Sequence, residues 1–214
     1  MNSLNKNIIA ITEAIQDQIS PQDALKILKE GNQRFVAQKK LDRNPLDQIS
    51  MTSESQYPFA AILGCIDSRV PAEMVFDLGI GDSFNTRIAG NFVNKDILGS
   101  LEFACKVAGA KIIVVLGHKS CGAVKGACAN VELGNLTSML EKIQPAVEIA
   151  KAGRENVDTS SPEFIQKVAD LNVELAIKKI KTYSPILNEM YENNEIDIVG
   201  AMYDITTGEV EFFD

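Results

Sequence analysis

The most constraining stretch of the chain is an uninterrupted apolar run at residues 112–116, IIVVL, which a glycine closes. A short run rich in β-branched residues and bounded by a turn residue is typical of a strand buried on both faces of a sheet. The segment that follows, GHKSCG, contains His118, the only histidine of the chain, and Cys121, one of four cysteines. The sequence therefore predicts a nitrogen ligand and a sulfur ligand where a buried strand ends.

Further predicted strands and helices alternate along the chain around this run. The predicted strands are residues 59–65, 83–89, 112–116, 197–203 and 210–213. The predicted helices are residues 5–18, 20–36, 71–79, 97–107, 136–152 and 160–182, and a further helix starts at residue 123. Residues 41–57 are polar and are predicted to form a loop. This alternation predicts an α/β fold, with a mostly parallel central sheet of four to five strands flanked by helices.

Charge and composition exclude several classes of protein. The net charge of −8 argues against nucleic acid as a partner, because phosphate binding needs a basic surface. No stretch approaches the roughly 20 apolar residues that a membrane helix requires, and the first residues show no secretory signal. We therefore expect a cytoplasmic protein with no membrane partner. The four cysteines are too sparse for a disulfide scaffold.

Cysteine and histidine side chains at the ends of predicted strands suggest a metal site. Cys65 ends the strand 59–65, His118 closes the apolar run, and Cys121 follows it. Parallel α/β sheets bind ligands beyond the carboxyl ends of their strands, so the three side chains can converge there. Two thiolates and one imidazole suit Zn²⁺, and three protein ligands leave a fourth tetrahedral position open, as in catalytic zinc sites.

Other interpretations of these residues stay open at this point. One is that His118 lies in a turn and that the cysteines serve as buried small hydrophobic side chains. A cysteine–histidine nucleophile pair is another, although it leaves the second cysteine without a role. A zinc deaminase requires H-x-E and P-C-x-x-C, and a thioredoxin-like centre requires C-x-x-C; the chain has none of these motifs.

Asp67 and Arg69 lie in the loop directly after Cys65. A carboxylate two residues from a metal-bound thiolate can ligate the metal or orient its water. An arginine two residues further along can hold that carboxylate through two hydrogen bonds. The alternative is a turn aspartate that caps the helix starting at Pro71, accompanied by a surface ion pair.

Three segments of the chain resemble the β-class carbonic anhydrases, in particular their plant-like branch. They are CIDSRVPAE at 65–73, GDSFNTRIAGN at 81–91 and GHKSCGA at 117–123. The combination of C-x-D-S-R with H-x-x-C, in this order and at this separation, is specific, and the resemblance covers residues 21–213. It implies a zinc enzyme that catalyses the reversible hydration of carbon dioxide to bicarbonate and a proton.

The resemblance also implies a role for each matching residue. Cys65, His118 and Cys121 match the zinc ligands. Asp67 and Arg69 match the catalytic dyad of the family, in which the aspartate closes onto zinc as a fourth ligand in an inactive state. The residues that match the substrate-binding pocket are Gln56, Phe84, Ala89, Phe103 and Gly122. The implied cofactor is Zn²⁺, and the implied partners are CO₂ or bicarbonate and further copies of the chain in a homodimer or homotetramer.

Two positions depart from the pattern of the family. Ile62 stands where a tryptophan forms part of an allosteric bicarbonate site in the bacterial branch, and the chain has no tryptophan, so we expect no bicarbonate inhibition of that kind. Ile66 is bulkier than the serine or alanine usual at its position. Two alternative functions remain: a bicarbonate- or zinc-sensing module of the same fold, and an enzyme that acts on CS₂ or COS.

The domain organisation follows from the position of the helices. The two N-terminal helices precede every predicted strand, and a βα core does not need them. We therefore expect residues 1–40 to form a helical arm that extends onto a partner subunit. Residues 41–214 then form the zinc-binding α/β catalytic domain, in a chain that is a single domain overall.

Overall fold

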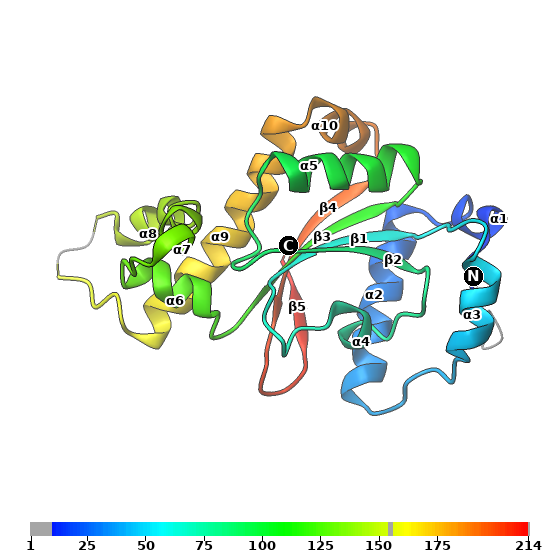
Figure 1. Ribbon diagram of the computed structural model, residues 1–214, viewed down its shortest axis with the longest axis horizontal. Coiled ribbons are helices and arrows are strands. Elements are labelled where there is room, and N and C mark those ends of the chain that lie inside the picture. Colours follow the sequence, from blue (N-terminus) through cyan, green and yellow to red (C-terminus); the bar gives the residue numbers. More distant parts are fainter. Residues whose placement is uncertain (1–9, 154–155, 214) are drawn as a thin grey trace.

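The computed structural model describes residues 10–153 and 156–213. Its centre is a five-stranded sheet with the strand order β2-β1-β3-β4-β5 (Figure 1). The strands are β1 Ala60–Gly64, β2 Ser83–Arg87, β3 Ile112–His118, β4 Asp197–Tyr203 and β5 Val210–Phe212. Strands β1 to β4 run parallel, and β5 is antiparallel to β4. The predicted α/β fold with a mostly parallel sheet is confirmed.

Strand β3 occupies the middle of the sheet, and all seven of its residues are buried. Its side chains alternate between two hydrophobic layers. Ile113 and Val115 pack into one layer, whereas Ile112 and Val114 pack into the other. A strand covered on both faces needs apolar side chains on both sides, which explains the continuous run in the sequence.

Helices cover both faces of the sheet. They are α1 Glu13–Gln16, α2 Pro21–Val36, α3 Pro45–Thr52, α4 Ala72–Val75, α5 Lys95–Glu102, the π-helix Phe103–Val107, α6 Gly122–Cys128, α7 Gly134–Leu140, α8 Gln144–Lys151, α9 Pro162–Tyr183 and α10 Pro185–Glu192. Buried side chains of α5, α6, α8, α9 and α10 form one layer, and those of α2 and α4 form the other. Figure 1 shows α2 and α4 across the sheet from α6 and α9. Within the described residues, no helix is both long and apolar enough to cross a membrane.

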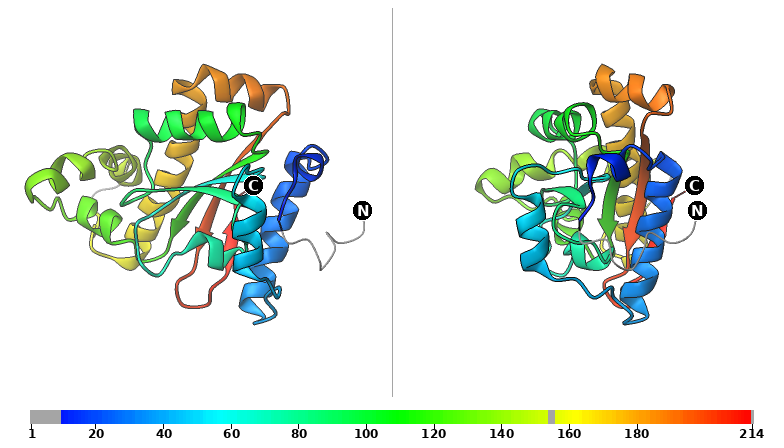
Figure 2. Two further views of the ribbon diagram at one scale, coloured as in Figure 1. Left: turned by 45° about the vertical axis from the view of Figure 1, so that its right-hand side comes forward. Right: turned by 90° about the vertical axis from the view of Figure 1, so that its right-hand side faces the viewer.

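The helix α2 begins where the sequence predicts it and packs on its own sheet. Ser20 and Asp23 form a capping box, in which each side chain accepts a hydrogen bond from the backbone N–H of the other. Asn32 donates to the carbonyl of Gly208 and accepts from the N–H of Val210, and Figure 2 shows α2 beside the C-terminal strands. An additional contact of the N-terminal helices with a partner subunit stays a prediction, as does the domain division after residue 40.

The structure corrects the prediction that residues 41–57 form a loop, because this segment contains α3. The Asn44 side chain accepts a hydrogen bond from the N–H of Leu46 and so caps the helix. Leu46, Ile49 and Met51 are all exposed in the single chain. Their apolar side chains form no buried stripe of helical period, and that stripe is the signal from which a helix is usually predicted.

Other helices differ from the prediction in their bounds. Residues 136–152 form two helices, α7 and α8, because Pro145 lies in the first turn of α8 and cannot continue a preceding helix. The helix predicted over 97–107 passes from α5 into the π-helix. The helix α10 has no predicted counterpart, although Ser184 caps it before a proline. Of the helix predicted over 5–18, α1 is the described part, and residues 1–9 lie outside the described residues.

Candidate metal centre

The three predicted ligands meet at the carboxyl edge of the sheet. Cys65 follows β1 directly, His118 is the last residue of β3, and Cys121 is the N-cap residue of α6. All three side chains are buried, and their ligand atoms lie within 4.8 Å of one another. In the described part of the chain, they are the one group of this kind. The structure thus brings together the three side chains that the sequence singles out.

Two backbone features set the path of the chain around these ligands. A Cβ on Gly117 would lie 2.7 Å from Val173 Cγ2, so glycine at this position lets α9 pack closely against the end of β3. Ser120 has a φ of 57°, in the left-handed region, and this conformation turns the chain between His118 and Cys121. Sheet and helix therefore fix the positions of both ligands.

His118 has one ring nitrogen without a hydrogen-bond partner. Its Nδ1 lies 3.0 Å from the carbonyl oxygen of Lys119, which can only accept, so we assign the proton to Nδ1. Its Nε2 is buried and has no hydrogen-bond partner among the described residues. An imidazole whose Nδ1–H is held by a carbonyl and whose Nε2 lone pair is free is the form that binds zinc. The donor set therefore fits a zinc ion.

The two cysteines form a coupled pair. Cys65 Sγ lies 3.9 Å from Cys121 Sγ and accepts a hydrogen bond from the N–H of Gly90 at 3.3 Å. The Cys121 thiol donates to Cys65 and, together with the N–H of Gly90, lowers the pKa of Cys65. The pKa of Cys121 is raised by its interaction with Cys65 and by the burial of the Cys121 side chain. The pair shares one proton, and a divalent cation in its place would stabilise both thiolates.

Asp67 and Arg69 form a two-fold hydrogen-bonded ion pair beside the ligands. Arg69 Nε donates to Asp67 Oδ1 at 2.9 Å, and Arg69 Nη2 donates to Oδ2 at 2.7 Å. Asp67 Oδ2 lies 3.8 Å from His118 Nε2. These bonds hold the pKa of Asp67 well below its usual range, chiefly through the Arg69 side chain. Helix α4 has no side-chain cap, so the alternative that Asp67 caps the helix at Pro71 is wrong.

Arg87, at the end of β2, supports the loop that carries Cys65 and Asp67. Its Nε donates to the carbonyl oxygen of Cys65 at 2.8 Å, and its Nη2 donates to that of Asp67 at 2.6 Å. One guanidinium thereby fixes the backbone on both sides of Ile66. No local sequence signal indicates this role, because the bonds span 22 and 20 residues.

We expect Arg87→Met to weaken zinc binding by about 10-fold, the lower end of the usual effect of outer-shell substitutions. The loop loses both hydrogen bonds and holds Cys65 less firmly. Equilibrium competition with a chromophoric chelator measures the affinity. Arg34→Met is the control, since the Arg34 guanidinium pairs with Asp77 instead. An unchanged zinc affinity in Arg87→Met would show that the loop keeps its position without this support.

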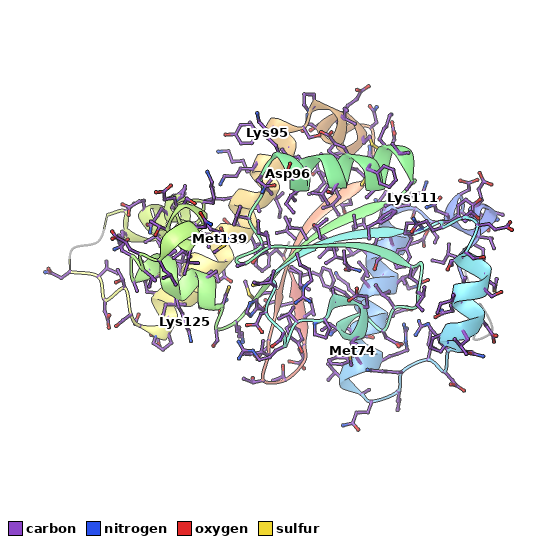
Figure 3. All side chains as sticks on the ribbon, viewed as in Figure 1. Met74, Lys95, Asp96, Lys111, Lys125 and Met139 are labelled. Carbon is purple, nitrogen blue, oxygen red and sulfur yellow. The ribbon has the colours of Figure 1, made fainter. Side chains whose placement is uncertain are left out.

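Phe84 and Phe103, which match the substrate pocket, pack edge to face with their ring centroids 5.9 Å apart. They line an open hollow of about 600 Å³ along β2 and α5. Figure 3 shows two other lining residues, Lys95 and Asp96, at the amino end of α5. The metal ligands are not part of the lining. Within one chain, the two rings therefore form an apolar surface separate from the ligands.

The remaining predicted pocket residues lie on opposite edges of the sheet. Ala89 lies one residue before the N–H that donates to Cys65 Sγ, and Gly122 is the first residue of α6, directly after a ligand. Gln56 is exposed and lies before the amino end of β1. Strand β1 extends about 16 Å before the chain reaches Cys65. The structure therefore does not bring Gln56 to the ligands within one chain.

Fold and site together define an α/β protein with a candidate metal centre of two cysteines and one histidine at the carboxyl edge of its sheet. The family model described as carbonic anhydrase matches residues 60–210. The chain belongs to the carbonic anhydrases, a family of lyases, and to their β class.

Relatives and solved structures agree with this assignment. Carbonic anhydrase 2 of Mycobacterium tuberculosis is 37% identical over 196 residues, which cover 88% of this chain and 91% of the relative. The structure of the β-carbonic anhydrase CafA of Aspergillus fumigatus matches with a TM-score of 0.71 and 26% identity, covering 90% of each chain. A structure from a study of two tetrameric β-carbonic anhydrases of Sordaria macrospora matches with a TM-score of 0.67 and 25% identity, covering 77% of this chain and 85% of that chain.

Proposed function

We propose that this protein is a zinc-dependent carbonic anhydrase that catalyses the reversible hydration of carbon dioxide to bicarbonate and a proton. The observation that carries the proposal is the buried Nε2 of His118, which has no hydrogen-bond partner among the described residues and lies in a group with Cys65 and Cys121. A buried polar atom without a partner costs free energy, and a metal ion removes that cost. Membership of the carbonic anhydrase family supports zinc as the metal and CO₂ as the substrate.

Each residue of the site has a chemical task in this proposal. Cys65, His118 and Cys121 would hold the zinc, which when bound lowers the pKa of water from about 15.7 towards about 7 and so supplies hydroxide at neutral pH. Asp67 is ionised at neutral pH, and Arg69 holds its pKa well below the usual range. Its carboxylate can therefore accept a hydrogen bond from the attacking oxygen and direct a lone pair at the carbon of CO₂.

A second copy of the chain would complete the substrate pocket. Gln56 lies at the opposite edge of the sheet from the ligands of its own chain, so we infer that it reaches the ligands of a partner subunit. The nearby helix α3 exposes Leu46, Ile49 and Met51, apolar side chains that an interface would bury. The tetrameric relatives from Sordaria macrospora support a dimer or a tetramer. Phe84 and Phe103 would then supply an apolar wall, with Ala89 and the backbone N–H of Gly122.

Stopped-flow CO₂ hydration by the zinc-loaded protein, measured across pH, tests the proposal. We expect hydration that requires zinc and rises with pH as the nucleophile forms. A zinc-loaded protein without hydration activity would favour the sensing module instead. A protein that hydrolyses CS₂ or COS but does not hydrate CO₂ would favour the other enzymatic alternative.

We expect turnover to depend strongly on external buffer. The only histidine of the chain is committed to the metal, so no free imidazole with a pKa near neutrality remains to carry protons out of the site. Raising the imidazole concentration should raise kcat several-fold and leave kcat/KM unchanged. A non-titrating salt at equal ionic strength is the control. A kcat that stays flat over the imidazole series, with chemistry not rate-limiting, would contradict this expectation.

A further inference from the structure

Helix α9 buries one polar side chain among apolar ones. The buried residues of this helix, all of whose residues the structure describes, are Phe164, Val168, Ala169, Asn172, Val173, Ala176 and Ile180. Asn172 is only 4% exposed. A buried amide costs free energy unless it is hydrogen-bonded. The presence of Asn172 in this layer therefore has to be explained by its partner.

That partner is the backbone at Gly90. Asn172 Nδ2 donates to the Gly90 carbonyl oxygen at 2.8 Å in buried surroundings. Gly90 has a φ of 81°, and a Cβ at this position would lie 2.5 Å from Ile143 Cδ1 and 3.2 Å from the Cβ of Ala123. Both the conformation and the close packing require glycine. Asn172 thus holds a residue that has little backbone preference of its own.

The N–H of the same glycine contacts the metal centre. Gly90 N donates to Cys65 Sγ at 3.3 Å, again in buried surroundings. Outer-shell hydrogen bonds orient a metal ligand and tune how strongly it donates electrons to the metal. The two backbone groups of Gly90 therefore link Asn172 to the sulfur of Cys65.

We propose that Asn172 is a positioning residue of the metal centre, which fixes Gly90 so that its N–H donates to the Cys65 thiolate. The inference rests on the metal centre of the proposed function. Without the Asn172 bond, the backbone at Gly90 is free to turn, and the thiolate loses both its orientation and the donor that withdraws charge from it. Zinc binding then weakens because the sulfur is no longer held in place, even though a sulfur without its N–H donor gives more charge to a metal that does bind.

The test compares Asn172→Leu, which has a side chain of similar size without a donor, with the unmodified protein. Zinc affinity, measured by competition with a chromophoric chelator, is expected to fall about 10-fold. In the Co²⁺-loaded variant, the thiolate-to-metal charge-transfer band is expected to move to longer wavelength, because a sulfur without its N–H donor is easier to oxidise. Val168→Ala removes buried methyl groups from the same helix and leaves Asn172 in place, so both readouts should stay unchanged.

An unchanged affinity and band in Asn172→Leu would overturn the proposal. An equal loss of affinity in Val168→Ala would overturn it too, because the effect would then come from the stability of α9. If the unmodified protein binds no zinc, the proposed function fails and this inference fails with it.

A measurement on the unmodified protein keeps the proposal testable even if Asn172→Leu does not fold. In ¹¹³Cd-loaded protein, the amide proton of Gly90 is expected to show scalar coupling to cadmium through the Cys65 sulfur. The absence of this coupling would show that the Gly90 N–H does not donate to the Cys65 sulfur, and the proposal would then be wrong.

Discussion

The Cys121→Ser variant is expected to lose its zinc and more than about 100-fold of its CO₂ hydration activity, since outer-shell changes alone cost about 10- to 100-fold. Cys121 Sγ lies 3.9 Å from Cys65 Sγ, in one buried group with His118. Serine is similar in size to cysteine, but its hydroxyl group does not ionise near neutral pH and binds zinc poorly. Elemental analysis of the purified protein measures the zinc content, and stopped-flow kinetics measure the hydration.

Cys128→Ser provides the matched control, because it makes the same substitution at the other end of the same helix. Cys128 is also a buried free cysteine, but it is not part of the ligand group. This variant should keep its zinc and its activity. A Cys121→Ser protein that is free of metal yet fully active would contradict the proposed function. Equal zinc loss in Cys128→Ser would show that disturbed folding, rather than a missing ligand, explains the result.

The sheet and its ligands could be predicted because their signals are local. The run at 112–116 is short, rich in β-branched residues and apolar at every position, as is typical of a strand covered on both faces. The end of that run fixes where His118 and Cys121 lie, and Cys65 directly follows β1 in the same way. Since parallel strands end at one edge of the sheet, their ends alone indicate that the three side chains converge.

The supports of the site could not be predicted, because they join segments far apart in the sequence. Arg87 reaches the carbonyl groups of Cys65 and Asp67 over 22 and 20 residues, and Asn172 reaches Gly90 over 82. Periodicity and capping signals describe single helices and strands, whereas these bonds depend on how the elements pack. No sequence pattern distinguishes an arginine at a strand end, or an asparagine in a long helix, from other polar residues.

Arg69→Met is expected to lower hydration about 10- to 100-fold at neutral pH while zinc stays bound. Arg69 makes both side-chain hydrogen bonds that hold the Asp67 carboxylate, whose Oδ2 lies 3.8 Å from His118 Nε2. Without them, only the backbone N–H of residue 69, which donates to Asp67 Oδ1 at 3.0 Å, still holds the carboxylate, and its other oxygen can turn into the position that the attacking oxygen needs. Hydroxide competes better with the carboxylate as pH rises, so the loss should shrink towards alkaline pH. Stopped-flow kinetics across pH, with zinc content measured on the same samples, check this result.

The titration of Asp67 itself does not produce this pH dependence. Arg69 holds the pKa of Asp67 below its usual range, and the variant returns that pKa towards the ordinary value of about 4. A carboxyl group whose pKa is depressed in the folded protein stabilises the fold at every pH above its ordinary, unfolded-chain pKa. That stabilisation is lost only as pH falls through the depressed pKa of the folded protein. From about pH 6 upwards, the carboxylate is ionised in both proteins. A pH-dependent loss in that range therefore reports competition at the metal.

Two further variants separate this role from the loss of an ion pair. Lys119 and Asp204 form a matched ion pair at the same edge of the sheet, because both pairs have an N···O distance of 2.7 Å. The side chains of Lys119 and Asp204 are 49% and 18% exposed, and those of Arg69 and Asp67 are 53% and 16% exposed. Exposed pairs contribute about 0–1 kcal/mol, so Lys119→Met should change hydration little. If Arg69 acts by holding Asp67, adding Arg69→Met to Asp67→Asn should cause no further loss, because asparagine is not an anionic ligand. Additive losses would instead assign Arg69 a contribution of its own.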